Sequence, residues 1–358
     1  MFYRLCLLLS GIAASYSLQA CLLAVPEPVS TQLAASLVGA EPRQVNIYNN
    51  LSLSEPTATG TLALYSANSP QLLDRLQQWP VANGNIGAIL AQPVVLDSNY
   101  DGMADGIYAV DVTGLLWFVG LQGSRFTAPE LIADFSALGY QFSQPLQLVQ
   151  TRAAGPTGQL QYQPTLILTA SDGLQSSIVI ALKHRAQRPG VVVLADLIDR
   201  SSIDADEVRY GIAEQQWSEL QQAGGWYIGL SRQIISKPQV YAGVVYLLSA
   251  TAGSVSADCT LAANAAPALH AVHLHHAGLV YARREQPLQL QNTGVLALEQ
   301  DENDALQLVL QQGQSKQLLK TELQAISEEC ADCTEPLTAA QFPQLIRLAT
   351  FQTEYGAH

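Results

Sequence analysis

Short runs of β-branched and aromatic residues alternate along this chain with turns rich in Gly, Asp, Asn and Ser. Runs of a few apolar residues bounded by turn residues are typical of β-strands. Helical spacing is convincing in only three places, residues 70–79, 213–222 and 315–327. The pattern therefore predicts an all-β fold with a few short helices.

A hairpin unit recurs along the chain: an apolar strand that carries an alanine, a turn, and an apolar return strand. The best copies span 107–117 and 269–281, and a third joins 178–182 to 190–194 across a longer turn. Weaker openings of the unit lie at 62–65 and 295–298. The repeated alanines are Ala63, Ala109, Ala181, Ala271 and Ala297.

Repeated hairpins of this kind are the parts from which propeller blades are built. A lone hairpin is unstable in water, so the copies must pack on one another. The alanines are spaced irregularly, from 26 residues (271 to 297) to 90 residues (181 to 271), whereas a regular propeller repeats about every 40–50 residues. We therefore expect an irregular β-propeller of about four to six blades, with a β-sandwich of similar hairpins as the alternative.

Residues 1–20 have the organisation of a secretory signal. Arg4 is the only charged residue before an apolar run, 5–18, that is too short to span a bilayer. The tetrapeptide 18–21, Leu-Gln-Ala-Cys, is similar to a bacterial lipobox, which predicts that Cys21 becomes lipidated. Cleavage after Ala20 without lipidation is the alternative. Either reading predicts an exported protein of the outer membrane, periplasm or cell surface, attached to the membrane only through such a lipid.

The remaining cysteines agree with export to an oxidising compartment. If Cys21 carries lipid, then Cys259, Cys330 and Cys333 are left to supply one disulfide and one unpaired thiol. The pair 330–333 has no second pair with which to hold zinc. Cys259 can join either member. We expect residues 22–311 to form the propeller and residues 312–358 a helical tail that contains this pair.

The chain carries a formal charge of −13 and has only four lysines. Nucleic-acid binding needs a positive surface that displaces counterions, so this class of partner is excluded. The same acidity disfavours docking on anionic lipid heads.

The strongest chemical signal is the segment 97–105, Asp-Ser-Asn-Tyr-Asp-Gly-Met-Ala-Asp. Oxygen-bearing side chains occupy its positions 1, 3, 5 and 9, and Gly at position 6 allows a sharp turn, as in the first nine positions of an EF-hand loop. The segment therefore predicts a calcium site. Its ligands are the side chains of Asp97, Asn99, Asp101 and Asp105 and the backbone carbonyl of Met103.

The segment differs from an EF-hand in two ways. Position 12 is Tyr108 instead of a bidentate Glu, and the flanking runs 94–96 and 107–110 are strand-like. A nine-residue loop with Asp105 as a direct ligand fits this sequence better. Magnesium is disfavoured because it prefers fewer protein ligands in a stricter octahedron.

The residues around this loop, 93–117, resemble the calcium-bearing blade of the PilY-type pilus-tip proteins. The shared pattern is a strand, the Asp-rich loop, and then Tyr108, Asp111, Gly114 and Trp117 in this order. A second stretch, 225–246, begins with Gly-Trp-Tyr and resembles a later blade of the same family, with Cys259 following soon after.

The resemblance, which spans about residues 90–285, implies a role with type IV pili. Proteins of this family sit at the pilus tip or in the envelope and help assembly, surface sensing or adhesion. Calcium occupancy is tied in them to the balance of pilus extension and retraction. Minor pilins or other pilus and envelope proteins are the partners that the resemblance implies.

The other polar clusters are weaker signals. His270, His273, His275 and His276 can be read as a zinc or copper site or as a solvent-facing strand edge, and the edge is favoured because no carboxylate or Cys lies in the segment. Asp204, Asp206 and Glu207 are expected in a solvated turn.

No phosphate-binding glycine loop or nucleophile elbow is present in the sequence. We therefore expect a non-catalytic protein. An envelope scaffold unrelated to pili and, less favoured, a quinoprotein-like propeller enzyme are the alternatives.

Overall fold

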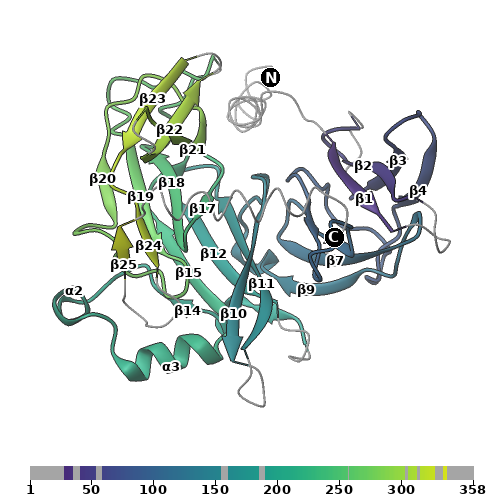
Figure 1. Cartoon of the computed structure of the whole chain (residues 1–358), viewed down its shortest axis with the longest axis horizontal. Helices are drawn as coiled ribbons and strands as arrows, with labels where there is room; N and C mark the ends of the chain where they lie inside the picture. The colour runs from purple at the N-terminus through teal and green to yellow at the C-terminus, as the bar shows by residue number, and fades with distance from the viewer. Residues whose placement is uncertain are drawn as a thin grey trace, which may run out of the picture. The chain divides into compact units, whose positions relative to one another are not determined.

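The computed structural model describes residues 28–34, 41–53, 59–154, 160–184, 190–256, 258–302, 305–312, 315–326 and 334–336. The predicted signal and the cysteines at 21, 330 and 333 lie outside these residues. Strands dominate the described chain, which confirms the all-β prediction (Figure 1). No described helix is both long and apolar enough to cross a bilayer.

The chain divides into two compact units. The described part of the first unit comes from Pro26–Leu168 and Leu182–Leu197, and that of the second from Thr169–Ala181 and Ile198–Ala339. Each unit is described by itself below.

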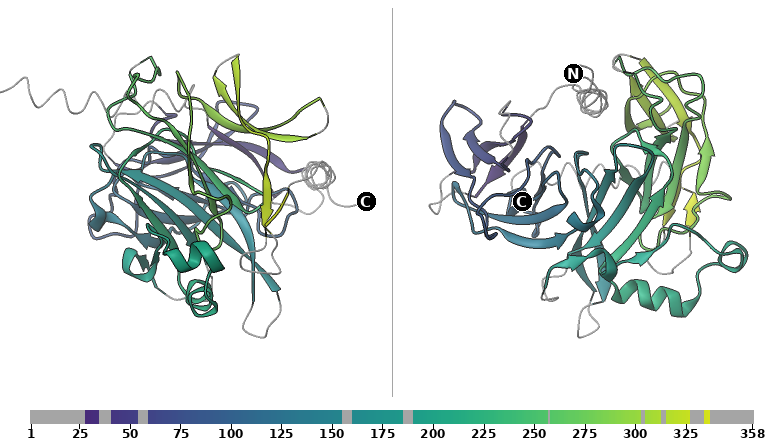
Figure 2. Two further views of the ribbon diagram at one scale, coloured as in Figure 1. Left: turned by 90° about the vertical axis from the view of Figure 1, so that its left-hand side faces the viewer. Right: turned by 180° about the vertical axis from the view of Figure 1, so that it is seen from behind.

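A four-stranded antiparallel sheet begins the first unit, with its strands in sequence order (purple in Figure 2). Its strands are β1 (Val29–Leu33), β2 (Arg43–Asn49), β3 (Leu62–Ser66) and β4 (Leu72–Leu76). β4 lies where we expected a helix over 70–79, so that prediction was wrong. The backbone of 72–76 pairs with the open edge of β3, from Leu62↔Leu76 to Tyr65↔Leu72, and this pairing overrides the helical spacing.

The second sheet of this unit carries the predicted calcium loop. Its strand order is β13-β9-β7-β6-β5, and β8 pairs with β7. The strands are β5 (Val94–Leu96), β6 (Gly106–Val110), β7 (Leu115–Gln122), β8 (Arg125–Phe126), β9 (Glu130–Asp134) and β13 (Val192–Val193). The predicted hairpin 107–117 is confirmed as the β6–β7 pair, with Ala109 opposite Trp117. β13 was expected to return beside 178–182, but it pairs in parallel with β9.

A third sheet has the strand order β10-β11-β12-β15-β14. Its members are β10 (Gln147–Ala154), β11 (Leu160–Ser171), β12 (Ser177–Lys183), β14 (Ile198–Asp199) and β15 (Gly225–Leu230). Two 3-10 turns, Ser136–Leu138 and Leu194–Asp196, occur in the first unit.

The second unit contains the two α-helices of the described chain, α2 (Ala205–Tyr210) and α3 (Glu214–Gln222). The prediction of a helix over 213–222 is confirmed by α3. Residues 204–207 were expected in a solvated turn and instead start α2, where the Asp204 side chain accepts a hydrogen bond from the Glu207 N–H. A side-chain acceptor of this kind satisfies a helix N–H that has no partner inside the helix.

The remaining sheets of the second unit have the orders β16-β18-β19-β20, with β17 on β18, then β21-β22-β23, and β24-β25. Their strands are β16 (Gln233–Ile234), β17 (Gln239–Tyr241), β18 (Val244–Ala250), β19 (Ala268–His273), β20 (Glu285–Pro287), β21 (Val295–Gln300), β22 (Leu306–Gln312), β23 (Ser315–Lys320), β24 (Gln324–Ile326) and β25 (Thr334–Pro336). The helix expected over 315–327 was wrong, because the described residues there form β23 and β24. Polar residues follow one another in β23 because it is a partly exposed edge strand that pairs with β22 alone.

The repeated alanines mark equivalent places in four of these sheets. Each of four alanines is buried on a strand that has a neighbour on both sides. They are Ala63 on β3, Ala109 on β6, Ala181 on β12 and Ala271 on β19. Ala297 lies on the edge strand β21 and is only half-buried. These four alanines therefore mark interior strands, one in each of four sheets. The hairpin predicted over 269–281 was only half right, because β19 pairs with β18 and β20 and its predicted return strand contributes a single bridge, Val272↔Leu279.

The β6–β7 turn is held by one buried carboxylate. Asp111, with 0% of its surface exposed, accepts hydrogen bonds at Oδ1 from the N–H groups of Gly114 and Leu115, each at 2.9 Å. The same oxygen accepts from Thr113, at 3.0 Å from its N–H and 2.7 Å from its hydroxyl. Oδ2 accepts from the Gly87 N–H at 2.8 Å. Asp111 thus ties the turn to a segment 24 residues earlier in the chain.

Gly114 completes this turn because no other residue fits its position. Its φ is +103°, a region that L side chains rarely adopt. A Cβ there would also come within 2.7 Å of the Phe142 ring. Behind the turn, Trp117 packs on Trp79 with ring centroids 5.1 Å apart.

Replacing Asp111 with Asn is expected to destabilise the protein by about 2–3 kcal/mol, because an amide N–H₂ in place of Oδ2 leaves the Gly87 N–H facing a donor. Urea unfolding at pH 7 measures this change. Asp134→Asn is the matched control, since among the described residues the Asp134 side chain bonds only to nearby Ser136, through an oxygen that Asn retains. The control should stay within about 0.5 kcal/mol. Equal stability of the two variants would contradict the role given to Asp111.

Candidate functional site

The predicted calcium loop joins β5 to β6, and the strand pairing Leu96↔Gly106 closes its base. The Asp105 N–H adds a further hydrogen bond to the Leu96 carbonyl at 2.8 Å. Residues 98, 99 and 101 are exposed, while Ala104 is buried. The loop therefore projects from a fixed strand pair and offers its polar side chains to solvent.

Inside the loop, side-chain oxygens accept hydrogen bonds from backbone N–H groups two to five residues further along the chain. Asp97 accepts from the N–H of Gly102 at 2.8 Å and of Asp101 at 3.2 Å. Asn99 Oδ1 accepts from the Asp101 N–H at 2.9 Å, and Asp101 Oδ1 from the Met103 N–H at 2.9 Å. These bonds turn the side chains at positions 1, 3 and 5 toward the loop's own backbone.

The turn needs residues that tolerate left-handed backbone angles. Gly102 has a φ of +82°, as the sixth position of such a loop requires. Tyr100 has a φ of +60°. Its ring stacks edge-on against Tyr162 of β11, with centroids 5.8 Å apart, and partial burial together with Tyr162 and Asp97 raises the pKa of the Tyr100 hydroxyl.

Backbone and side-chain contacts from three other segments of the first unit support the loop. The Ala104 N–H donates to the Gln32 carbonyl of β1, and the Leu121 N–H of β7 donates to the Asp105 carbonyl, both at 2.8 Å. The Gln150 amide of β10 donates to the Asp97 carbonyl at 2.8 Å. Sequence reasoning missed Gln150 and Tyr162, because only the fold brings β10 and β11 beside the loop.

The fourth predicted side-chain ligand, Asp105, lies in a separate arrangement. Its Oδ2 accepts from the Ser98 N–H at 2.7 Å and from the Ser98 hydroxyl. In the described part of the chain no three His, Cys, Asp or Glu side chains are grouped to hold a metal ion. The structure thus links Asp97, Asn99 and Asp101 and leaves Asp105 with Ser98.

The donor chemistry of the loop fits a hard cation. Its three carboxylates and one amide all offer oxygen, and residues 97–105 contain no Lys or Arg that could neutralise them. Each oxygen that accepts one N–H keeps a second lone pair for a metal. Calcium, which takes six to eight oxygens in flexible geometry, suits such a set.

Tyr108, the twelfth position counted from Asp97, has a structural role instead of a ligand role. It is fully buried on β6, and its hydroxyl lies 2.6 Å from the His184 Nδ1. Burial raises the pKa of this phenol, and burial lowers the pKa of His184. A neutral tyrosine and a neutral histidine therefore share one hydrogen bond there.

The histidine cluster in the second unit is not a solvent-facing edge. His270, His273 and His276 are each at most 3% exposed, so that prediction was wrong for all three. The rings of His273 and His276 stack with centroids 3.8 Å apart, and Trp217 of α3 contacts the His276 ring edge-on at 5.9 Å. The alternation of a strand pattern did not reveal that α3 covers this face.

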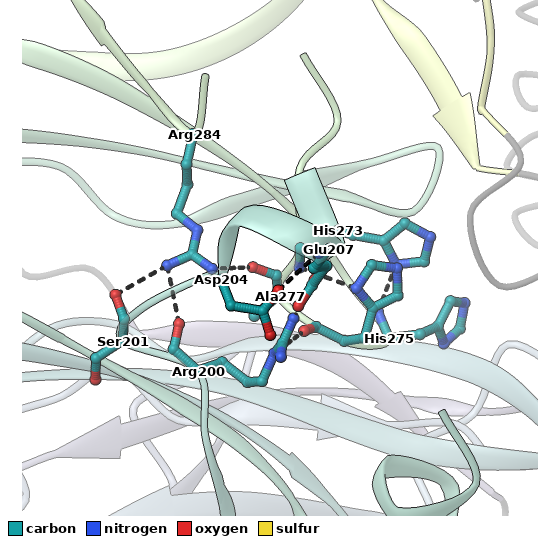
Figure 3. A network of polar contacts seen from close by, with 10 residues as sticks. Arg200, Ser201, Asp204, Glu207, His273, His275, Ala277 and Arg284 are labelled. Carbon is teal, nitrogen blue, oxygen red and sulfur yellow. Dashed lines mark hydrogen bonds and ion pairs between the residues drawn. The ribbon is translucent and has the colours of Figure 1, made fainter. Parts of the chain in front are cut away.

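An ion pair supports the same cluster (Figure 3). Buried Arg200 pairs with Glu207 of α2 and donates through Nε to the His276 carbonyl at 2.8 Å. Arg284 donates to the carbonyls of Arg200 at 2.9 Å and Ala277 at 2.6 Å. The network fixes α2 and the turn after β19 to each other, which is a structural role.

The rings of His273 and His276 are not oriented as zinc or copper ligands. The Nδ1 atoms of His273 and His276 both accept backbone N–H groups, from His275 at 3.2 Å and Gly278 at 3.0 Å. A neutral ring that accepts at Nδ1 carries its proton on Nε2, so neither nitrogen offers a metal its lone pair. Burial, followed by His276 and His275, lowers the pKa of His273 well below its usual value.

Cys259 is disulfide-bonded. It is the only cysteine among the described residues, so its pairing with Cys330 or Cys333 and the lipidation of Cys21 stay predictions.

Comparison with known proteins identifies similar folds but shows no family to which this chain belongs. The C-terminal domain of Pseudomonas aeruginosa PilY1 is similar in structure, with a TM-score of 0.53 and 14% sequence identity over 82% of this chain and 71% of that one. BamB from Moraxella catarrhalis gives a TM-score of 0.27 at 12% identity over 78% of this chain and 75% of that one. No family model and no curated sequence matches the chain.

The likeness to the PilY1 domain supports the predicted fold class, an irregular β-propeller with a few short helices. The described sheets, five of them with three or more strands, agree with the four to six blades expected from the sequence.

Acid should destabilise the second unit through His270, whose Nε2 lies 2.7 Å from the Ser249 hydroxyl. Burial, together with Arg232 and Arg284, lowers the pKa of His270 from 6.5 to about 4. The unfolded chain binds this proton near pH 6.5 and the folded chain only near pH 4. Acidification across that window therefore favours unfolding, by about 3 kcal/mol at its lower end.

His270→Gln keeps a polar group beside Ser249 and removes the titration. The loss of unfolding free energy between pH 6.5 and 4.5 should then be smaller than in the parent by about 2 kcal/mol. Urea unfolding at several pH values measures how the free energy of unfolding of the parent and of the variant changes with pH. The same pH dependence in both proteins would contradict a neutral, buried His270.

Proposed function

We propose that this chain is a non-catalytic, calcium-binding protein of the bacterial cell envelope that serves type IV pilus biogenesis, function or adhesion. The loop Asp97–Asp105 carries the proposal, since it combines an oxygen-only donor set with a fixed strand base. The fold similarity to the PilY1 C-terminal domain supports the pilus assignment.

The hydrogen bonds inside the loop favour calcium binding. Asp97, Asn99 and Asp101 each accept an N–H from two to five residues further along, so the three side chains are held on one side of the turn. A cation that enters this turn meets oxygens already oriented by the backbone. Preorganisation of this kind lowers the ordering cost of binding.

The negative charge of the loop also favours a divalent cation. Three carboxylates lie within nine residues, and no basic side chain lies in the loop. Like charges so placed repel one another, and a divalent cation relieves that repulsion. Calcium binding should draw Asp105 away from Ser98 and toward the other ligands, including the Met103 carbonyl. The loop's affinity then reflects both this rearrangement and the number of charged ligands.

The position of the loop in the fold connects calcium binding to the neighbouring strands. Its two ends are β5 and β6, and its carbonyls accept from Leu121 and Gln150. Calcium that orders the loop therefore also stabilises the contacts among β5, β7 and β10. We infer that bound calcium makes this blade more rigid. A pilus partner then recognises the rigid form of the blade. Minor pilins or other envelope proteins are the proposed partners, and a lipid on Cys21 is the proposed attachment.

Asp101→Asn is expected to weaken calcium binding at least about tenfold, because the number of charged ligands sets affinity in such loops. The Asn oxygen can still accept from the Met103 N–H, so the fold should be kept. Isothermal titration calorimetry with calcium measures the affinity, and thermal unfolding with calcium or EGTA measures the stabilisation. Glu41→Gln, an exposed acid outside the loop, is the matched control and should bind like the parent.

A parent protein that takes up no calcium in the calorimeter would refute the site. Equal affinity of the parent and Asp101→Asn would show that the ion lies elsewhere.

In the native host, deletion of the gene should reduce twitching or surface piliation, and the chromosomal Asp101→Asn allele should alter the same phenotypes. The reason is that an apo-like blade presents a less ordered surface to its partner. The Glu41→Gln allele is the control and should behave as the parent. Normal pili in the deletion strain would refute the pilus role without refuting the calcium site. The protein would then be assigned a scaffold role outside the pilus.

A further inference from the structure

The sheet β1–β4 carries a pocket on the face turned away from the core. Alternation along β2 buries Val45 and Ile47 and therefore directs Asn46 and Tyr48 to the opposite face. Strand pairing sets Tyr65 of β3 directly opposite Asn46. The rings of Tyr48 and Tyr65 meet edge to face, with centroids 5.1 Å apart and an interplanar angle of 70°.

These side chains line a cavity of about 430 Å³. Ser52, Ser66 and Ser69 complete its polar wall, and Leu53 and Pro70 add apolar surface. The volume falls in the range of small-molecule sites, roughly 300–1,000 Å³.

None of the lining residues carries a charge. Phosphate and carboxylate ligands are recognised by Arg, Lys or clustered N–H groups. Ammonium ligands are recognised by acidic side chains or by a cage of aromatic ring faces, and Tyr48 and Tyr65, which meet edge to face, do not form such a cage. A charged ligand would lose its hydration here without an opposite charge to replace it. The pocket therefore fits a neutral molecule.

Most polar groups of the pocket have no partner in the described part of the protein; the Ser52 hydroxyl is the exception, because it bonds to Asn49. The Ser30 hydroxyl donates to the Asn46 Oδ1 at 2.7 Å, and among the described residues neither amide hydrogen of Asn46 has an acceptor. Within the residues the structure describes, no hydrogen bond involves the side-chain hydroxyl of Tyr48, Tyr65, Ser66 or Ser69. Each hydroxyl both donates and accepts. A purely apolar ligand would leave these groups without partners, at a cost in free energy.

We propose that this pocket binds a neutral sugar ring. A pyranose presents an apolar C–H face, which packs on an aromatic ring, and a rim of hydroxyls, which both donate and accept. Tyr48 and Tyr65 supply ring surfaces at a steep angle to each other, and Asn46 with the free hydroxyls supplies the matching rim. The proposal is independent of the calcium loop, because none of the pocket residues belongs to it.

Saturation-transfer-difference NMR on the full exported chain tests this with glucose, galactose, mannose and N-acetylglucosamine. We expect transfer to the ring C–H protons of at least one of these sugars, in calcium and in EGTA alike. Tyr48→Ala should abolish the transfer. Tyr65→Phe keeps the ring and should weaken the affinity about five- to tenfold, the loss of one hydrogen bond. Tyr210→Ala, which removes a 71% exposed tyrosine far along the chain, should bind as the parent does.

Thermal unfolding of each variant separates lost binding from lost folding, and Tyr65→Phe serves if Tyr48→Ala does not fold. A parallel titration with the neutral polysaccharide dextran distinguishes the source of the sugar. If dextran binds more tightly than the single sugars, the natural ligand is a surface glycan. If it binds equally, the natural ligand is a free sugar. Both results support sugar binding in this pocket. No transfer to any neutral sugar, equal transfer in Tyr48→Ala, or transfer to sialic acid alone would overturn the proposal.

Discussion

The register of β6 against β7 is the constraint on which the candidate calcium site depends. Asp111 fixes it, since one buried carboxylate accepts from the turn residues Thr113, Gly114 and Leu115 and from Gly87. Once β6 is fixed, its first residue Gly106 and the partner Leu96 fix both ends of the loop. The loop can then be exposed and highly charged, because its position is set by buried bonds at the other end of β6.

The same arrangement explains why the motif residues around the loop belong together. Tyr108, Asp111, Gly114 and Trp117 are all on β6, its turn or β7, and each is buried or conformationally restricted. Tyr108 bonds to His184, and Trp117 packs on Trp79. Among the described residues, none of these four forms a hydrogen bond to a side chain of the loop. They stabilise the β6–β7 strand pair, whereas Asp97, Asn99 and Asp101 supply the candidate ligands.

The sequence predicted best those features that depend on neighbours along the chain. The loop 97–105 and the hairpin 107–117 are local, because turn residues and alternation suffice to define them. α3 was likewise predicted, whereas 70–79 and 315–327 were misread as helices. In those two segments the apolar spacing fitted a helix, but pairing with β3 or β22 decided the outcome.

Features that depend on distant segments were not predictable from the pattern. The burial of His273 and His276 depends on α3 and on the Arg200–Glu207 pair. The parallel pairing of β13 with β9 joins residues some 60 positions apart. The support of the loop by Gln150 and Tyr162 has the same origin. Long-range placement of this kind leaves no periodic signal in the sequence.

We propose that Asp97, Asn99, Asp101, Met103 and Asp105 surround one calcium ion. The decisive measurement is a crystal structure of the protein grown in calcium, with anomalous scattering data. We expect a single anomalous peak in the loop, with oxygens of these residues about 2.3–2.6 Å from it, and Asp105 released from Ser98. A loop without a peak at saturating calcium, with Asp105 still bonded to Ser98, would refute calcium binding at this loop.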